Sequence, residues 1–167
     1  MFDWTHFRST VYLRVPLAVA YAAWSTARGL ERWFPATATI RDAAGKARRH
    51  LDLARGGDLY RFTWFRGHVG GGKILAARHP TTVRFTFGDP VVVTARLQAV
   101  RGGTRVTVVQ EGIPDSARHR VHTHLKCRLS WCFYLNNLKA VLEHGVDLRD
   151  RDPSHLKSHL ESGIVSY

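Results

Sequence analysis

Residues 117–145 read ARHRVHTHLKCRLSWCFYLNNLKAVLEHG and form the longest segment with a helical repeat. Apolar residues recur along it at intervals of three and four, the spacing of one face of an α-helix. The recurring positions are Val121, Leu125, Leu129, Cys132, Leu135, Leu138 and Leu142, and the aromatic residues that widen the face are Trp131, Phe133 and Tyr134. Ser116 is suited to cap the start and Gly145 to end the helix in a left-handed conformation. We therefore expect one long amphipathic helix over 117–144.

The chain before this helix is a series of short alternating segments separated by turn residues, which is typical of strands. These segments are STVYLRV (9–15), ATATIRD (36–42), KARRHLDL (46–53), LYRFTWF (59–65), GKILAAR (72–78), TTVRFTF (81–87), PVVVTARLQAV (90–100) and TRVTVVQEG (104–112). The alternation places Tyr60, Phe62 and Trp64 on one face, with Arg61 and Thr63 on the other. Such segments predict an antiparallel sheet with one apolar face and one face in water. The long helix is the element available to cover the apolar face.

Residues 16–34, PLAVAYAAWSTARGLERWF, predict two short helices hinged at Gly29. Pro16 suits the first turn of a helix because its φ angle is already helical. The apolar run over 15–24 also has features of a signal peptide, since Arg8 and Arg14 precede it. Asp3 and the strand-like alternation before the run favour an ordinary strand and helix.

Residues 67–74 read GHVGGGKI and imitate a phosphate-binding loop. In such a loop the last position is Ser or Thr, because its hydroxyl binds magnesium, and a helix follows. Here the last position is Ile74, and the chain that follows is interrupted at Pro80 before it alternates like a strand. We therefore expect a hairpin turn in this glycine run, and no nucleotide.

The length of 167 residues predicts a single domain over 1–150, followed by a tail over 151–167. No apolar run reaches the roughly 20 residues of a membrane-spanning helix. Cys127 and Cys132 are spaced so that they point to different sides of the helix, which disfavours a disulfide and suits a reducing cytoplasm. A formal charge of +12 favours anionic partners without naming one.

The order of elements, and four segments in particular, resemble the START-like/SRPBCC superfamily, which includes the birch-pollen-allergen fold. The segments are VPLAVAYAAWSTARGLERWFPATATIRDAAG, GKILAARHPTTVRFTF, GGTRVTVVQEGIP and SWCFYLNNLKAVLEHGVDLR. Within the superfamily, the chain is most similar to domains related to the activator of the ninety-kilodalton heat-shock protein's ATPase. The resemblance covers residues 9–149. It implies an α+β helix-grip fold, in which a curved antiparallel sheet wraps around the long C-terminal helix, with two short helices after the first strand.

This resemblance also implies a cavity between sheet and helix that takes a lipid or another apolar small molecule, without catalysis. The side chains expected to line it are Trp33, Phe62, Trp64, Phe85, Phe87, Val93, Trp131, Leu135 and Leu138. The same side chains could instead meet and fill the space, giving an ordinary core. A domain that docks on a chaperone or another protein, and a cyclase that acts on aromatic polyketides, are the alternatives.

Catalytic and metal sites are weakly indicated. Gln110, Glu111 and His124 are polar residues that could lie near the cavity, and the resemblance to cyclases would need such a group. His155 and His159 have the i, i+4 spacing of metal ligands on a helix, while His119, His122 and His124 do not converge on one face. Neither group has a convincing third ligand, so we expect no cofactor and no metal.

Basic residues crowd two regions, residues 41–55 and the start of the long helix. Arg118, Arg120, Lys126 and Arg128 form a candidate anion-binding patch at the helix start. Cations at that end oppose the helix dipole, so an anionic partner or nearby carboxylates would offset their cost. Aromatic residues do not alternate with these basic runs, as stacking on single strands would require, so this pattern disfavours nucleic acid as a partner.

Overall fold

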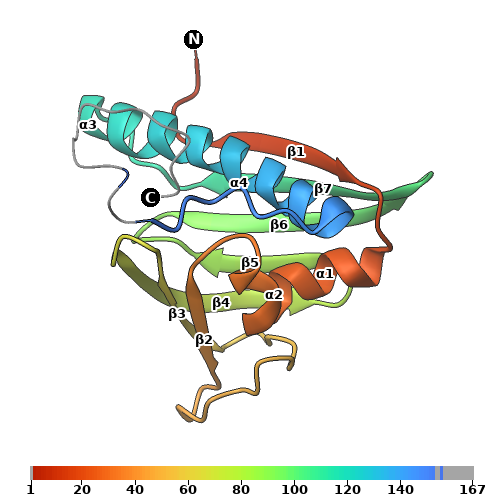
Figure 1. Ribbon diagram of the computed structural model, residues 1–167. Helices are drawn as coiled ribbons and strands as arrows, with labels where there is room; N and C mark the ends of the chain where they lie inside the picture. The colour runs from red at the N-terminus through yellow and green to blue at the C-terminus, as the bar shows by residue number, and fades with distance from the viewer. Residues whose placement is uncertain (1, 153–154, 156–167) are drawn as a thin grey trace.

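The computed structural model describes residues 2–152 and 155 and shows a curved sheet with a long helix across one face (Figure 1). The first half contains β1 (Phe7–Leu13), α1 (Leu17–Ser25), α2 (Ala27–Glu31), β2 (Thr37–Arg41), β3 (Leu59–Thr63) and β4 (Val69–Arg78). The second half contains β5 (Thr82–Thr86), β6 (Val92–Val100), β7 (Gly103–Glu111), α3 (Ala117–His119), the π-helical turn η1 (Arg120–Leu125) and α4 (Lys126–His144). The predicted α+β helix-grip class is confirmed.

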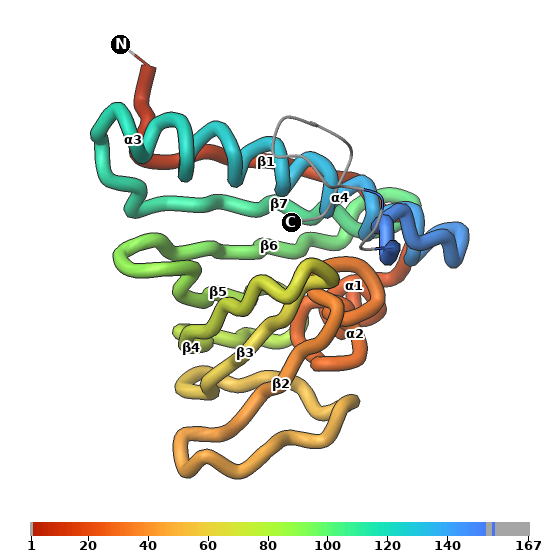
Figure 2. The backbone as a smooth tube through the Cα atoms, turned by 60° about the vertical axis from the view of Figure 1, so that its left-hand side comes forward, coloured from red at the N-terminus to blue at the C-terminus, as the bar shows by residue number. Residues whose placement is uncertain are grey.

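Seven antiparallel strands form the sheet in the order β1-β7-β6-β5-β4-β3-β2 (Figure 2). Each neighbouring pair from β2 to β7 is consecutive in sequence, while β1 pairs with the last strand, from Phe7↔Gln110 to Leu13↔Thr104. Apolar and polar side chains alternate along the strands, and this alternation decides which face of the sheet is buried. In β7, for example, Val106 and Val108 point inward and are buried, whereas Arg105 points outward and is exposed. The inner face is therefore apolar and the outer face carries charge.

The long helix begins and ends where its sequence predicts. The hydroxyl of Ser116 accepts a hydrogen bond from the backbone N–H of His119, and Gly145 has φ 69°. The backbone is continuous through α3, η1 and α4, with one wide turn in which the bonding pattern is π-helical. That wide turn was not predicted.

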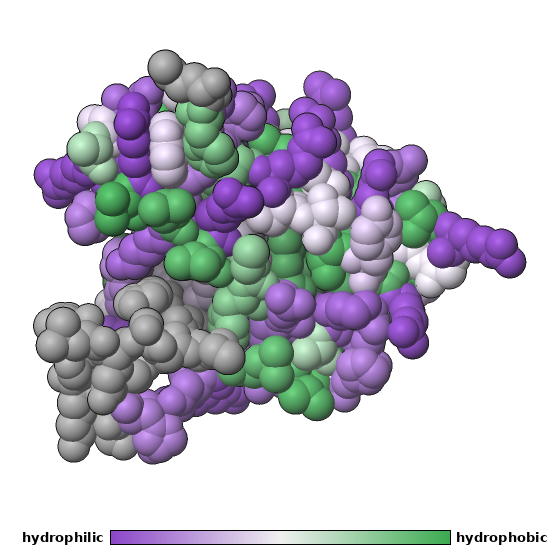
Figure 3. All heavy atoms as spheres, turned by 90° about the horizontal axis from the view of Figure 1, so that it is seen from above, coloured by the Kyte–Doolittle hydropathy of each residue, from purple (hydrophilic) through white to green (hydrophobic). Residues whose placement is uncertain are grey.

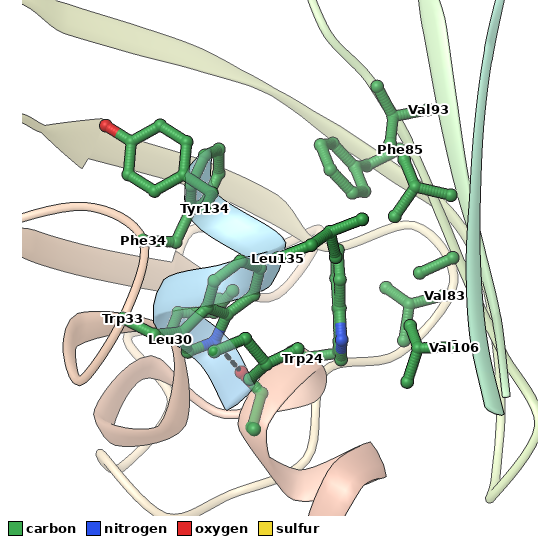
Figure 4. Packing of buried hydrophobic residues seen from close by; sticks show 14 of the residues in the cluster. Trp24, Leu30, Trp33, Phe34, Val83, Phe85, Val93, Val106, Tyr134 and Leu135 are labelled. Carbon is green, nitrogen blue, oxygen red and sulfur yellow. Dashed lines mark hydrogen bonds between the residues drawn. The ribbon is translucent and has the colours of Figure 1, made fainter. Parts of the chain in front are cut away.

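The core lies between the inner face of the sheet, α1, α2 and the second half of α4 (Figure 4). Its largest members are indoles: the ring centroids of Trp24 and Trp33 lie 4.6 Å apart, and those of Trp24 and Trp131 lie 5.8 Å apart. The indole N–H of Trp33 donates to the carbonyl of Ala23 at 2.9 Å. Under this part of the helix the interior is filled by side chains.

Three local predictions are wrong. The two short helices separate at Thr26, whose backbone is extended and whose hydroxyl caps α2, and not at Gly29. Gly29 lies inside α2, where only glycine fits because a Cβ there would lie 2.2 Å from the carbonyl oxygen of Ala22. The glycine run belongs to β4, since Gly70, Gly71 and Gly72 pair with β3, and the hairpin turn lies before it at 64–68.

The third wrong prediction is the strand over 46–53. That stretch makes a single bridge, Arg41↔Ala47, and is otherwise a loop. The guanidinium of Arg48 turns inward to the buried carboxylate of Asp58, with Nη2 donating to Oδ1 at 2.7 Å. An ion pair reaching across ten residues holds the loop in a shape that strand pairing does not allow.

The predicted apolar stripe of the long helix splits into two parts. Leu135 and Leu138 are buried in the core, together with Trp131, Tyr134 and Val141. Val121, Leu125 and Leu129 are 55%, 41% and 72% exposed, and Cys132 is exposed as well. Seen from above, apolar and hydrophilic side chains lie side by side on this part of the surface (Figure 3). The first half of the helix thus does not bury its stripe in the sheet.

Candidate functional site

A cavity of about 360 Å³ opens between the start of the long helix and the turns at one end of the sheet. It is lined by Phe34, Trp64, Arg66, His68, Phe87, His122, Lys126, Cys127, Ser130, Trp131 and Tyr134. Its volume is near the lower end of the range of small-molecule sites. The site therefore suits a ligand of modest size.

Aromatic rings make the floor of this cavity. Phe34 and Trp131 stack with centroids 5.1 Å apart, and Phe34 meets Trp64 edge to face at 5.7 Å. Gly70 packs against Trp64 from behind, where a Cβ would lie 3.2 Å from the ring. The indole N–H of Trp131 donates to the side-chain oxygen of Gln110 at 2.8 Å in the interior. Because these rings are fixed by their neighbours, the floor is a rigid apolar surface.

The rim carries groups that bear or can accept positive charge. Arg66 and His68 come from the turn between β3 and β4, His122 from η1, and Lys126 from the start of α4. Among the described residues that line the cavity, none is acidic. An aromatic floor with a cationic rim has the polarity that suits an apolar body with an anionic group.

Cys127 is the one thiol among the described residues that line the cavity. Burial raises the pKa of its thiol, and this outweighs the opposite effects of Gln110 and Lys126. The thiol is therefore protonated near neutral pH, and a protonated thiol is a poor nucleophile.

Three of the nine predicted lining residues, Trp64, Phe87 and Trp131, border this cavity. The other six lie in the packed core: Trp33, Phe62, Phe85, Val93, Leu135 and Leu138. The sequence analysis missed Phe34, Cys127, Ser130 and Tyr134, as well as the three rim residues Arg66, His68 and His122. Two basic residue types on either side of Gly67, at a hairpin tip, are the sequence signal that could have indicated the rim.

The candidate anion patch at the helix start is divided in the structure. Arg120 donates to the carboxylate of Asp115 at 2.6 Å and lies 5.7 Å over the ring of Trp4. Lys126 lines the cavity, whereas Arg118 and Arg128 are exposed and do not line it. One member of the patch is thus a rim residue, and another is paired with a nearby carboxylate.

The three polar candidates for catalysis do not line the cavity. Gln110 is buried behind Trp131, and Glu111 pairs with Arg84 at 3.0 Å on the outer face of the sheet. His124 is buried on another side of η1, where its Nδ1 donates to the carbonyl of Trp4 at 2.9 Å. The structure therefore does not bring these groups together.

The described residues form neither a metal cluster nor a phosphate-binding loop. Among the described residues, no group of three or more His, Cys, Asp or Glu is arranged to hold a metal ion. His159 lies outside the described residues, as does most of the predicted tail. The glycine run continues directly as β4, without a helix whose amides could face a phosphate. Within the same part of the chain, no helix has the length and apolar character needed to cross a membrane.

Comparison with protein families identifies the domain. A family model described as "Activator of Hsp90 ATPase homolog 1-like protein" matches residues 14–143, most of the chain. The chain belongs to this family. The match begins directly after β1 and ends in the last turn of α4, so it includes every residue that lines the cavity, and it places the fold in the START-like/SRPBCC helix-grip superfamily.

Solved structures support the same fold. A protein from Staphylococcus saprophyticus is 17% identical, with a TM-score of 0.67 over 86% of this chain and 95% of its own. The Aha1 dimer from Colwellia psychrerythraea is 16% identical, with a TM-score of 0.67 over 84% and 97%. A protein from Chromobacterium violaceum is 25% identical, with a TM-score of 0.61 over 83% and 97%. A search of curated protein sequences gives no match.

Proposed function

We propose that this family member binds a small apolar molecule with an anionic group, and that it does so without catalysis. The ligand's apolar body lies on the aromatic floor, and its anionic group faces the rim. The observation that carries this proposal is the polarity of the cavity: rings below, basic side chains above, and no acidic residue among the described lining residues.

The size of the cavity limits the ligand. At about 30 Å³ per water molecule, 360 Å³ corresponds to roughly a dozen waters. That space suits an aromatic or medium-chain carboxylate better than a sterol. A long chain would have to extend through the open mouth into solvent.

Binding without catalysis is favoured by the chemistry of the lining. His68 and His122 have no carboxylate beside them within the described lining that could orient an imidazole as a general base. The raised pKa of Cys127 keeps its thiol protonated. The groups present can hold an anion, but they are not arranged as an acid–base pair or an activated nucleophile.

Fluorescence titration with 8-anilino-1-naphthalenesulfonate tests this function, together with a matched pair, 2-naphthoate and 2-naphthylmethanol, as competitors. We expect the carboxylate to displace the probe at least tenfold more effectively than the alcohol. The double variant Arg66→Gln/Lys126→Gln should weaken naphthoate binding by at least tenfold, since a single charge-assisted hydrogen bond is worth about 1.5 kcal/mol.

Arg128→Gln is the matched control, because Arg128 is an exposed cation on the same helix that does not line the cavity. Equal displacement by acid and alcohol would contradict the anionic part of the proposal. Absence of any response to either compound would contradict the cavity as a binding site.

A protein-interaction function is the second candidate, because the matched family is named for a chaperone ATPase activator. The exposed residues Val121, Leu125 and Leu129 on the long helix are the feature that favours it, since apolar residues at helical spacing are common at docking faces. Pull-down with an Hsp90-type ATPase at low and high salt separates the two candidates. Retention that is lost in Leu125→Gln/Leu129→Gln, with naphthoate binding unchanged, would support the interaction function.

A further inference from the structure

Cations on the outer face of the sheet form a diagonal line that the linear sequence hides. Arg105 on β7 lies opposite Gln98, and Arg96 on β6 lies opposite Thr107. Because residues opposite each other in a ladder point to the same face, Arg96 and Arg105 are diagonal neighbours. Both are exposed.

The line continues across the next strands with the same step. Arg84 on β5 lies opposite Thr94, two residues from Arg96, and is therefore the next diagonal neighbour. On β4, the backbone N–H of Lys73 donates to the hydroxyl of Thr86 at 2.9 Å, which places Lys73 one further row along. On β3, Arg61 lies opposite Gly71, diagonal to Lys73.

Five cations thus cross five adjacent strands, from β7 to β3, and we refer to them as the diagonal stripe: Arg105, Arg96, Arg84, Lys73 and Arg61 (strand order in Figure 2). Diagonal neighbours in a sheet lie about 7–8 Å apart, so the stripe is roughly 30 Å long. Each step moves one strand across and two residues along, counted on β5 for the step to Lys73, because β4 has a bulge between Ile74 and Ala76.

The surroundings of the diagonal stripe are also basic. The register places Arg8, Arg41 and Arg78 on the same face. Against these eight cations, the outward positions of the described strands carry one carboxylate, Glu111, which is paired with Arg84 at 3.0 Å. This face therefore accounts for more than half of the formal charge of +12. The basic residues of β1, β6 and β7 also border a groove of about 620 Å³ in which no described lining residue is acidic.

We propose that the diagonal stripe binds the phosphate backbone of double-stranded nucleic acid, without reading its sequence. Four of the five cations are arginines, whose planar forks match phosphate oxygens. Threonine hydroxyls, which are common donors to phosphate, lie in the same row as Arg96, namely Thr10, Thr107 and Thr82. This function uses the outer face and is independent of the ligand cavity, whose floor is formed by side chains of the inner face.

Other polyanions fit this face less well. Stacking on single strands needs several exposed aromatic rings, and along β1 and β5–β7 the outward positions carry one, Tyr12. The cores of protein interfaces are depleted of charge and contain apolar anchors, whereas the centre of this face is charged. The exposed leucines nearby, Leu59 and Leu75, flank Lys73 at one end and do not form a central patch. Sequence-independent contact with the phosphate backbone of a duplex is therefore the favoured mode of binding.

Fluorescence anisotropy with a labelled 20-base-pair DNA duplex of random sequence tests the proposal by its salt dependence. Five phosphate contacts predict a slope of log K against log[salt] of about −4.5, which is roughly a 500-fold loss of affinity between 50 and 200 mM. The triple variant Arg84→Gln/Arg96→Gln/Arg105→Gln retains two cations of the stripe, so its slope should fall to about −2. A second duplex of unrelated sequence, and an RNA duplex, should give affinities within a few-fold of the first.

The control variant Arg32→Gln/Arg118→Gln/Arg128→Gln removes the same charge from helical positions and their ends. It should keep a slope near −4.5. Both triple variants should keep the wild-type circular dichroism spectrum and the wild-type binding of 8-anilino-1-naphthalenesulfonate. Equal loss of slope in the two variants would show a general charge effect and overturn the assignment to the stripe. Binding to poly-glutamate or to phosphatidylglycerol vesicles as tight as to the duplex, and lost in the stripe variant, would overturn the choice of partner.

Discussion

Replacing the buried Arg149 with leucine is expected to destabilise the protein by about 3 kcal/mol. The guanidinium is 1% exposed and donates to the backbone carbonyls of Glu31, Phe34 and Pro35 at 2.7–3.3 Å. It also donates to both carboxylate oxygens of Asp147, at 2.9 and 2.8 Å. Leucine would leave all of these acceptors without their donor.

The magnitude follows from what remains after the change. Breaking a buried ion pair by removing one partner costs about 3–5 kcal/mol. Asp147 keeps hydrogen bonds from Arg151 and Asn137, so the lower end of that range applies. For a chain of this size, 3 kcal/mol corresponds to a fall in Tm of roughly 6–12 °C. Because Phe34 lines the cavity, weaker binding of naphthoate should accompany the loss of stability.

The stability that the ion pair of Arg149 and Asp147 contributes should depend on pH. Burial raises the pKa of Asp147, but the hydrogen bonds from Arg149 and Arg151 outweigh it, and the pKa lies well below its usual range. A carboxyl group of this kind adds stability above its unfolded pKa of about 3.9, and that stability is lost as the pH falls through the folded pKa. The difference in the free energy of unfolding between wild type and Arg149→Leu should therefore be largest at pH 7 and smaller at pH 3.5.

Urea unfolding at both pH values, followed by tryptophan fluorescence, measures that gap. Arg151→Leu is the control, since Arg151 binds the same carboxylate from an exposed position and should contribute less than about 1 kcal/mol. A loss below 1 kcal/mol for Arg149→Leu, or a gap that does not change with pH, would refute the reasoning.

Three further predictions concern the sheet and the cavity. Gly72→Ala should lower the free energy of unfolding in urea by about 1–3 kcal/mol, because its Cβ would lie 2.3 Å from the hydroxyl of Thr86. Gly71→Ala should cost less, because the nearest atom to its Cβ would lie 3.1 Å away, and equal costs would count against the steric argument. Cys132 should react with iodoacetamide at pH 8 faster than Cys127, whose pKa burial raises, and naphthoate should slow only Cys127, as mass spectrometry of tryptic peptides would show. Trp131→Phe should cost about 1–3 kcal/mol because it removes the hydrogen bond that the indole N–H donates to the buried side-chain oxygen of Gln110, and Trp131→Phe/Gln110→Leu should recover part of that loss in thermal unfolding.

The ends of the long helix and the faces of the strands could be predicted because they depend on local chemistry. Ser116 and Gly145 act within one turn of their own position, and alternation fixes the side of the sheet on which Val106 or Arg105 lies. The loop over 46–53 could not be predicted, because its shape depends on an ion pair between Arg48 and Asp58 that competes with strand pairing.

The position of the cavity could not be predicted from the sequence, for a different reason. Apolar residues such as Trp33 and Leu138 are equally suited to a core and to a pocket wall, and relative volumes decide between them. The rim residues Arg66 and His68 lie at a hairpin tip, where no periodicity marks them. The diagonal stripe was hidden because each of its members belongs to a different strand, and only the register shows that they are neighbours.

The π-helical turn η1 lies between the three residues of α3 and the nineteen residues of α4. A π turn holds about one residue more than an α-helical turn, so the deletion of one residue such as Thr123 can be absorbed by conversion to an α-helical turn, with little rotation of the flanking segments. The packing of Trp131, Leu135 and Leu138 would not need to change. A change of length at this turn would therefore alter the cavity entrance at His122 while the hydrophobic interior under α4 stays as it is.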